Sequence, residues 1–226
     1  MHDVGIYENL ILGIHFLLLK KCKIFDEKTI VRCYTGRSMR INVRKHERRG
    51  YQSIKMSNIL EKQFLKQRND FEKSCVERDK KYHFPQGVIF ETDIAYAKDK
   101  NKAHRLDRYR PKGKETQILP VIINVHGGGL LLGNKEFNKY FCALLSKKGF
   151  LVYSMEYRLI PDCTFFDQLR DIFLAMDFVK EHAAADGGDL SHVYLVGDSG
   201  GACLATYANA IQNSKKNCKG SGHKTV

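Results

Sequence analysis

Two glycine-rich segments of the sequence contain the residue types that acyl-transfer chemistry requires. The first is the segment 126–129 (HGGG), and the second is the segment 197–201 (GDSGG). The second has the G-x-S-x-G pattern, in which a serine lies on a sharp strand-to-helix turn and can act as a nucleophile. Backbone N–H groups of a glycine loop can hydrogen-bond to the oxyanion that forms when such a serine attacks an acyl carbonyl. The two segments together predict a nucleophile with an oxyanion hole.

The residues around the serine are those that a nucleophile turn needs. Residues 192–196 (HVYLV) are apolar and β-rich, which predicts a buried strand, and residues 202–211 contain no Gly or Pro, which predicts a helix. Gly197 and Gly201 are small enough to allow a sharp turn around Ser199. The N–H of Gly200, at the positive end of the helix dipole, would point toward the oxyanion. The alternative is a glycine-rich turn in which the serine has no chemical role.

The glycine loop directly follows a continuous apolar run. Residues 118–125 (ILPVIINV) predict a central parallel strand that is buried on both faces. Consecutive glycines after such a strand are expected where backbone amides approach an oxyanion or a phosphate. No Lys-Ser/Thr pair follows and the spacing does not fit a dinucleotide fingerprint, which argues against a nucleotide site. His126 precedes the serine in the chain, and we interpret it as a structural hydrogen-bonding residue rather than a catalytic base.

Four segments together resemble the hormone-sensitive-lipase-like branch of the α/β-hydrolases, which includes bacterial acetyl esterases and other carboxylesterases. They are residues 106–111 (LDRYRP), 126–129 (HGGG), 157–161 (YRLIP) and 197–201 (GDSGG), and the resemblance covers roughly residues 86–213.

The resemblance implies a role for each matching residue of the two glycine-rich segments. Ser199 is similar to the family's nucleophile, and the N–H groups of Gly128, Gly129 and Gly200 are similar to its oxyanion donors. The supporting residues of the motifs are His126, Gly127, Gly197, Asp198 and Gly201, of which Asp198 is expected to be structural. The chain departs from the common pattern at two positions: the family often has Ala where this chain has Gly200, and Glu where it has Asp162.

The residues after Ser199 include no candidate for the rest of a catalytic triad in the family's chain order. Residues 200–226 contain no Asp or Glu, and their single histidine is His223, in a segment without periodicity. We therefore expect an α/β-hydrolase fold truncated after the helix of the elbow, with the strand at 192–196 as an exposed sheet edge. Two functions stay open: a serine carboxylesterase acting on short-chain acyl esters, inactive if the triad is incomplete, or a non-catalytic protein that binds a small ligand. The plant gibberellin receptors, which resemble this branch, are of the second kind.

The elements that must position these motifs follow from the hydrophobic periodicity. Strands expected near 88–96, 106–110, 118–125, 150–156 and 192–196 alternate from residue 118 onward with helices expected at 135–147, 165–182 and 202–211. This order predicts a mostly parallel sheet with helices on both faces. Residues 53–81 predict one amphipathic helix, and residues 10–19 a short core or cap helix. The expected organisation is an N-terminal helical cap segment (1–85), the hydrolase core (86–213) and a disordered tail (214–226).

Composition restricts the other classes of function. The net charge of +13 lies almost entirely in residues 1–115, but no nucleic-acid-binding motif accompanies it. Seven cysteines, an odd number without a C-x-x-C pair, favour a reducing, cytoplasmic location and predict no metal site. The apolar run 10–19 is too short to span a bilayer and lacks the basic flank of a signal peptide. We expect a small-molecule ester as partner, no cofactor, no nucleic acid and no stable membrane insertion.

Overall fold

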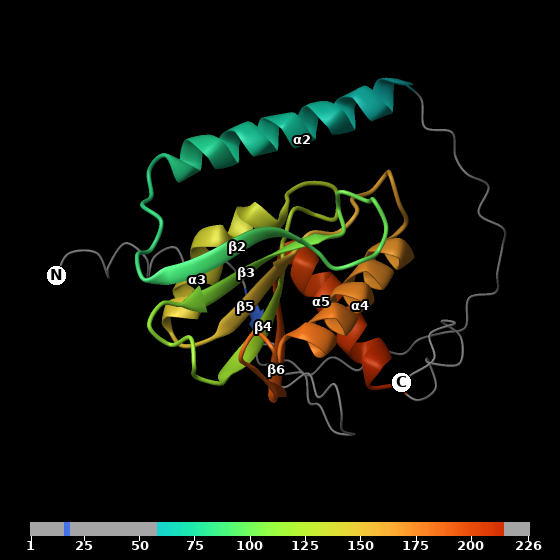
Figure 1. The fold of residues 1–226 in the computed structure, drawn as a ribbon. Helices are drawn as coiled ribbons and strands as arrows, with labels where there is room; N and C mark the ends of the chain where they lie inside the picture. Colours follow the sequence, from blue (N-terminus) through green and yellow to red (C-terminus); the bar gives the residue numbers. More distant parts are fainter. Residues whose placement is uncertain (1–15, 19–57, 215–226) are drawn as a thin grey trace.

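A computed structural model describes residues 16–18 and 58–214 of the chain (Figure 1). The described strands form one six-stranded sheet in the order β1-β6-β4-β5-β3-β2. Their bounds are β1 Phe16–Leu18, β2 Val88–Ala95, β3 Arg105–Pro111, β4 Leu119–Val125, β5 Leu151–Met155 and β6 Gly188–Asp198. The three central strands β6, β4 and β5 are parallel, and the outer strands β1, β3 and β2 pair in antiparallel fashion. The predicted α/β fold is confirmed, but the sheet is mixed rather than mostly parallel, because its parallel pairings are confined to the centre.

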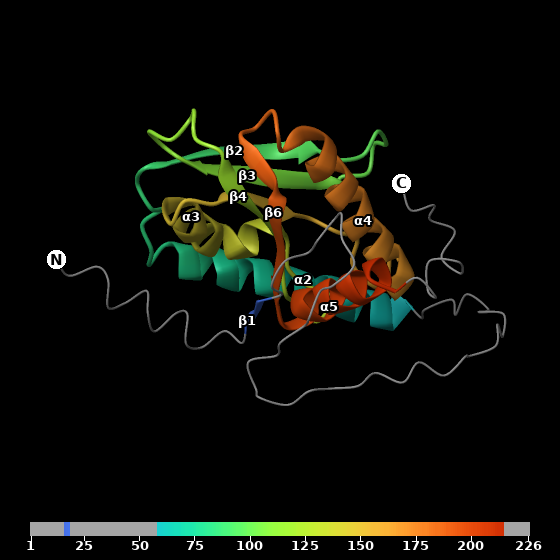
Figure 2. The same ribbon diagram turned by 90° about the horizontal axis from the view of Figure 1, so that it is seen from below.

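Helices cover both faces of this sheet, as the alternation of elements predicted (Figure 1). On one face lie α4, Phe165–His182, and α5, Ser199–Gln212. On the other lies α3, Lys139–Lys147, preceded by the 3-10 turn η1, Lys135–Asn138. The long helix α2, Asn58–Asp79, lies outside these layers and extends from the α3 side of the molecule to the end of α4 (Figure 2). The structure therefore has a three-layer core with one additional helix.

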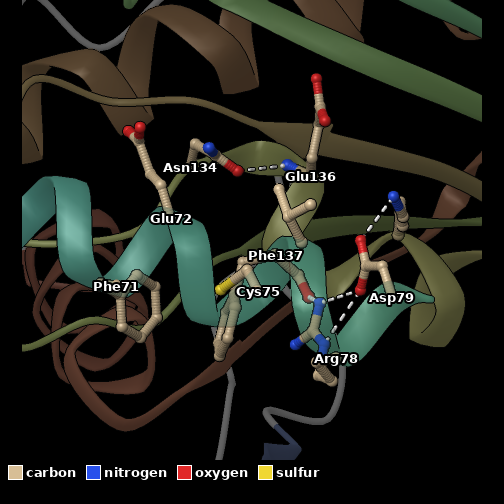
Figure 3. A pocket seen from close by; sticks show the side chains of 10 residues that line it. Phe71, Glu72, Cys75, Arg78, Asp79, Asn134, Glu136 and Phe137 are labelled. Atoms are coloured by element: carbon tan, nitrogen blue, oxygen red, sulfur yellow. Dashed lines mark hydrogen bonds and ion pairs between the residues drawn. The ribbon is translucent and has the colours of Figure 1, made fainter. Parts of the chain in front are cut away.

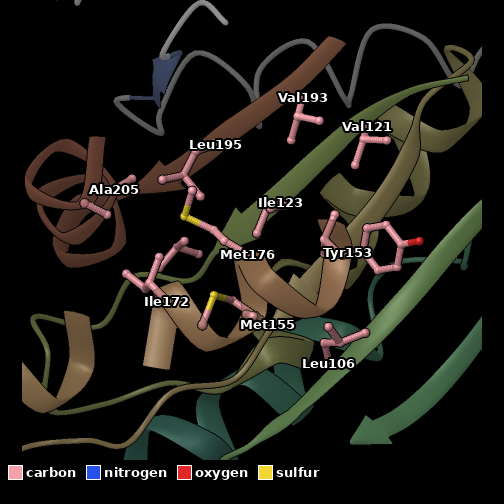
Figure 4. Packing of buried hydrophobic residues seen from close by; sticks show 14 of the residues in the cluster. Leu106, Val121, Ile123, Tyr153, Met155, Ile172, Met176, Val193, Leu195 and Ala205 are labelled. Carbon is pink, nitrogen blue, oxygen red and sulfur yellow. The ribbon is translucent and has the colours of Figure 1, made fainter. Parts of the chain in front are cut away.

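The core follows from the alternation of side chains along the central strands. In β4, Val121, Ile123 and Val125 are buried on the face covered by α4 and α5, whereas Ile122 is buried against α3. Successive side chains of a strand point to opposite faces, so a continuous apolar run suits a strand covered on both sides. Figure 4 shows the larger of the two clusters, in which Leu195 and Met176 contribute from β6 and α4.

Helix α4 begins where a local signal predicts it. The Thr164 side chain accepts a hydrogen bond from the backbone N–H of Asp167, and the Asp167 carboxylate accepts one from the backbone N–H of Thr164. This reciprocal capping box satisfies amide donors that the first helical turn leaves free. The helix has the bounds predicted for it, residues 165–182.

The alternation of Val88, Phe90, Ile94 and Tyr96 in the sequence predicts an edge strand with these side chains on one face, and this prediction of a single face is wrong. A β-bulge between Glu91 and Ile94, with Asp93 at φ +60°, shifts the register of β2 against β3. Ile94 therefore pairs with Leu106 on the α4–α5 face, whereas Phe90 pairs with Tyr109 on the α3 face. A bulge adds one residue to one strand and so reverses which face the following side chains occupy.

Two expectations about the N-terminal region need correction. Part of the run expected to be a short helix, Phe16–Leu18, forms strand β1, which pairs with residues 196–198 of β6. The edge of β6 is therefore paired at residues 196–198, so the exposed edge expected at 192–196 is corrected at its elbow end only. Residues 10–15 and 19, like 215–226 of the expected tail, lie outside the described residues.

The long helix predicted at 53–81 is confirmed over the residues that the structure describes, Asn58–Asp79. Its half-buried side chains include Phe64, Phe71 and Cys75, which belong to the predicted apolar face. Leu65 and Val76 are about half exposed, at 49% and 57%. The helix thus contacts the rest of the structure along a narrow face and leaves much of its surface exposed.

Candidate active site

Ser199 occupies a tight turn between the end of β6 and the start of α5. Its φ is +46°, in the left-handed region that residues with a side chain seldom adopt. A Cβ added to Gly197 would lie 2.6 Å from the carbonyl carbon of Gly201, and one added to Gly201 would lie 2.2 Å from the Val125 oxygen. Only glycine fits at these two positions. Strained residues held by close packing of this kind cluster at functional sites.

The Asp198 carboxylate connects the serine turn to the glycine loop. Its Oδ1 accepts hydrogen bonds from the Gly127 N–H and from Asn138 Nδ2, both at 2.8 Å. A Cβ on Gly127 would lie 2.2 Å from Asp198 Oδ2, so the loop can approach the carboxylate only with glycine there. Asp198 is itself buried. The geometry supports a structural role for Asp198, and Asn138 is a partner that no motif indicated.

The glycine loop turns its backbone amides toward the first turn of α5. Gly128, Gly129 and Leu130 have φ values of +119°, +62° and +71°. The Gly128 carbonyl accepts hydrogen bonds from the N–H groups of Leu131 and Leu132 at 3.2 and 2.9 Å. A Cβ added to Gly200 would lie 3.0 Å from the Leu130 nitrogen and 3.1 Å from the Gly129 nitrogen. Three positive φ values in succession thus bring two loop amides directly against the residue after Ser199.

Neither of these two amides donates a hydrogen bond to any residue in the described part of the chain. Gly129 was predicted as a donor from its motif, whereas Leu130 was not. Every residue except proline carries a backbone N–H, so its side-chain type gives no signal of this use. The turn therefore presents two donors beside Ser199 that no described residue occupies, which is the arrangement that an oxyanion requires.

His126 is held within the loop by partners on all sides. Its Nδ1 lies 2.7 Å from the Gly127 carbonyl oxygen and its Nε2 lies 3.0 Å from Glu156 Oε1. The Tyr157 hydroxyl donates to the His126 carbonyl at 2.8 Å, and the two rings stack with centroids 4.3 Å apart. Burial, with the carboxylates of Glu156 and Asp198 nearby, raises the pKa of the Tyr157 phenol, which therefore stays a donor. Both ring nitrogens of His126 are engaged, which supports its interpretation as structural.

Other described histidines are also engaged away from the serine. His104 lies between the carboxylates of Asp99 and Asp171, at 2.7 and 3.1 Å. His192 lies 2.6 Å from Asp189 Oδ2. Within residues 58–214 no histidine hydrogen-bonds to Ser199. His223 lies outside the described residues.

The structure has a cavity of about 200 Å³ that is separate from the serine turn. It lies between α2 and η1, where Phe71 and Cys75 face Phe137, and Arg78 pairs with Asp79 at its rim (Figure 3). No group of three His, Cys, Asp or Glu side chains among the described residues is arranged to hold a metal ion. None of the described helices is long and apolar enough to cross a membrane. The candidate site is therefore the turn at Ser199 with its glycine loop.

Comparison with known proteins connects this geometry to a family. The sequence model of the family described as BD-FAE matches residues 106–225, a span that contains both glycine-rich segments and more than half of the chain. The chain belongs to the BD-FAE family. Known structures agree: esterase B from Lactobacillus rhamnosis, solved with a tributyrin phosphonate, aligns with a TM-score of 0.71 and 28% identity over 76% of this chain and 55% of that one. An esterase from Pyrobaculum calidifontis aligns with a TM-score of 0.56 and 28% identity, over 72% and 50% of the two chains.

Several curated relatives of the chain are named esterases as well. The isoprenylcysteine alpha-carbonyl methylesterase ICME of Arabidopsis thaliana is 32% identical over 52% of this chain and 27% of its own length. Versiconal hemiacetal acetate esterase of Dothistroma septosporum is 32% identical over 46% of this chain and 32% of its own length. The chain thus matches about a third or less of each of these relatives. The resemblance to carboxylesterases of the α/β-hydrolase fold, first indicated by the motifs, is confirmed.

Proposed function

We propose that the protein is a serine carboxylesterase whose nucleophile is Ser199. The observation that carries this proposal is the strained turn at Ser199, where the N–H of Gly129, which has no partner among the described residues, packs against Gly200. An idle serine turn would not need a left-handed φ at a residue with a side chain, nor two segments joined through the Asp198 carboxylate. The family membership and the esterase relatives support the same activity.

In the proposed reaction, the Ser199 hydroxyl oxygen attacks the carbonyl carbon of the ester and gives up its proton to a general base. The carbonyl π bond becomes an oxyanion, which accepts hydrogen bonds from the N–H groups of Gly128, Gly129 and Gly200. Collapse of this intermediate expels the alcohol, which takes up the proton, and leaves an acyl group on Ser199. Water then attacks the acyl-enzyme and releases the carboxylic acid. We propose that the base and its carboxylate partner come from outside the described residues.

We propose short-chain acyl esters as the substrate class. One relative, 32% identical, is named an acetate esterase. Another, esterase B, was solved with a tributyrin phosphonate, which also carries short acyl chains. A third relative is named as a methylesterase, which hydrolyses an ester with a small alcohol part. Together they support a small-molecule ester with a short chain on at least one side of the carbonyl.

We also propose a cytoplasmic, reducing environment. Cys75, Cys142, Cys163 and Cys203 are all free thiols in the described part of the chain. Disulfides form in oxidising compartments, so unpaired cysteines on the surface and in the core support this location.

The test compares Ser199→Ala with the native full-length protein on p-nitrophenyl esters of increasing acyl length. We expect native turnover on the acetate and butyrate, a sharp decline on long chains, and a loss of about 10⁴-fold or more in Ser199→Ala. A fluorophosphonate probe should attach to Ser199, as located by peptide mass spectrometry. Ser74→Ala, which removes an exposed hydroxyl on α2, is the matched control and should change nothing.

Retained turnover in Ser199→Ala would refute the assignment of the nucleophile. A native protein that neither hydrolyses esters nor reacts with the probe, yet binds a short-chain ester or acid, would instead favour the non-catalytic ligand-binding function.

A further inference from the structure

Arg68 of helix α2 makes three hydrogen bonds to two loops that border the candidate site. Its Nε donates to the Leu131 carbonyl at 3.0 Å, and its Nη2 donates to the Ile160 carbonyl at 2.8 Å. Its Nη1 contacts Asp162 Oδ2 at 2.8 Å. The side chain is only 17% exposed, although it arises from a helix with a largely exposed surface. No sequence motif indicated this residue.

The two carbonyl groups that accept hydrogen bonds from Arg68 belong to the segments that hold the glycine loop in place. Leu131 directly follows Leu130, whose amide lies against Gly200. The Leu130 carbonyl accepts hydrogen bonds from the Ile160 N–H at 3.0 Å and from Gln168 Nε2 at 2.9 Å. Arg68 therefore bonds to both sides of this contact, the loop at Leu131 and the facing segment at Ile160.

The loop needs such support because its backbone is strained. Leu130 has φ +71°, and a residue with a side chain keeps a left-handed conformation only where surrounding contacts enforce it. Rotation of the Leu130 and Leu131 peptide groups would redirect the amides that face Gly200. Hydrogen bonds to the carbonyls at 130 and 131 oppose that rotation.

We propose that Arg68 is a positioning residue for the oxyanion hole, acting through the Leu131 and Ile160 carbonyls. It makes the docking of α2 a condition for the correct orientation of the Gly129 and Leu130 amides. The inference rests on the proposed esterase function. It also gives a role to the cap segment predicted for the N-terminal region, since α2 supports the catalytic loop without contributing a group to the reaction.

The hydrogen bonds from Arg68 to the Leu131 and Ile160 carbonyl groups carry this role, rather than its ion pair with Asp162. The Asp162 side chain is 67% exposed, and exposed ion pairs contribute little because water and salt screen them. The planar guanidinium donates in several fixed directions at once, whereas a lysine ammonium on its flexible stem does not reproduce this fork. Lysine at position 68 should therefore keep the charge and lose the function.

The experiment compares four variants of the full-length protein: Arg68→Ala, Arg68→Lys, Asp162→Asn and Lys66→Ala. Lys66 is an exposed cation on the same helix and serves as the matched control. We expect kcat on p-nitrophenyl acetate to fall about 10- to 100-fold in both Arg68 variants, with KM within about twofold, because the oxyanion hole acts in the transition state. Asp162→Asn and Lys66→Ala should stay within about twofold of the native protein.

A second readout does not depend on activity. Amide hydrogen exchange measured by mass spectrometry should become faster in peptides covering 128–132 when Arg68 is replaced, and stay unchanged in the two other variants. If Arg68→Ala does not fold, as judged by thermal unfolding, Arg68→Lys decides the question.

Native kcat and native exchange in either folded Arg68 variant would overturn the inference, as would an equal loss in Asp162→Asn, which would assign the effect to the ion pair. If the native protein has no esterase activity and its serine does not react with the probe, the proposed function fails. The exchange at 128–132 then still decides whether Arg68 holds the loop: faster exchange supports it and unchanged exchange overturns it.

Discussion

Replacement of Gly200 by alanine tests how closely the oxyanion loop packs against the serine turn. Many members of the resembled family have alanine at this position, and the Gly200 backbone is helical, so the substitution causes no backbone strain. The added Cβ would nevertheless lie 3.0 Å from the Leu130 nitrogen and 3.1 Å from the Gly129 nitrogen, against ordinary contacts of 3.4 Å or more. The atoms that must move are the backbone nitrogen of Gly129, which is one of the proposed donors, and that of Leu130 beside it.

The size of the effect follows from this geometry. Relief of the contact requires a shift of about 0.4 Å, and a misplacement of about 1 Å at a reacting centre can cost about 10²-fold in rate. We therefore expect kcat to fall roughly tenfold, equivalent to about 1.4 kcal/mol of transition-state stabilisation. KM should change little, because these donors act mainly on the developing charge. Stability should rise or stay constant, since alanine is favoured over glycine within a helix by about 1 kcal/mol.

The assay measures kcat and KM on p-nitrophenyl acetate together with the denaturant midpoint of the same full-length variant. Gly201→Ala provides the contrast: its Cβ would lie 2.2 Å from the Val125 oxygen, inside the core, so it should lower the unfolding free energy by about 2 kcal/mol or more. Equal or higher kcat in Gly200→Ala would refute the reasoning, because it would mean that the loop amides do not depend on the contact with Gly200.

Two further predictions concern the scaffold. Hydrogen bonds from Thr164 lower the pKa of Asp167 in the folded protein. The ionised carboxylate therefore stabilises the fold fully above the ordinary aspartate pKa, and this stabilisation is lost as the pH falls through the lower pKa of the folded state. Asp167→Asn should lower the unfolding free energy by about 1 kcal/mol at pH 7. Urea titrations should show that the difference in unfolding free energy between the native protein and the variant becomes smaller near pH 3. A difference that does not depend on pH would contradict this prediction. Burial raises the pKa of the Cys142 thiol to about 12, whereas Cys203 is exposed. Iodoacetamide should therefore modify Cys203 in the native protein and Cys142 only after unfolding, and early modification of Cys142 would show that its surroundings open.

Local patterns were sufficient to predict the helices and strands between residues 58 and 214 and to identify the motifs. Helix α4 has the predicted bounds because its amphipathic pattern and its capping box are both contained in neighbouring residues. The strand at 119–125 follows from an apolar run that only a doubly covered strand can bury. Gly197 and Gly201 indicated a crowded turn because no side chain fits there, and that requirement is visible in the residue type alone.

Contacts between distant segments were decided only by the tertiary structure. The bulge in β2 reverses the face of its later side chains, because pairing with β3 rather than hydrophobic alternation sets the register. Strand β1 forms where a helix was expected, since an apolar run as short as Phe16–Leu18 takes the conformation that a neighbouring edge offers. The Leu130 amide could not be identified from its residue type, because the backbone N–H is common to nearly all residues. Arg68 meets its acceptors 63 and 92 residues further along the chain, so one arginine among the many charged residues of α2 acquires its role only when folding brings the loop carbonyls to it.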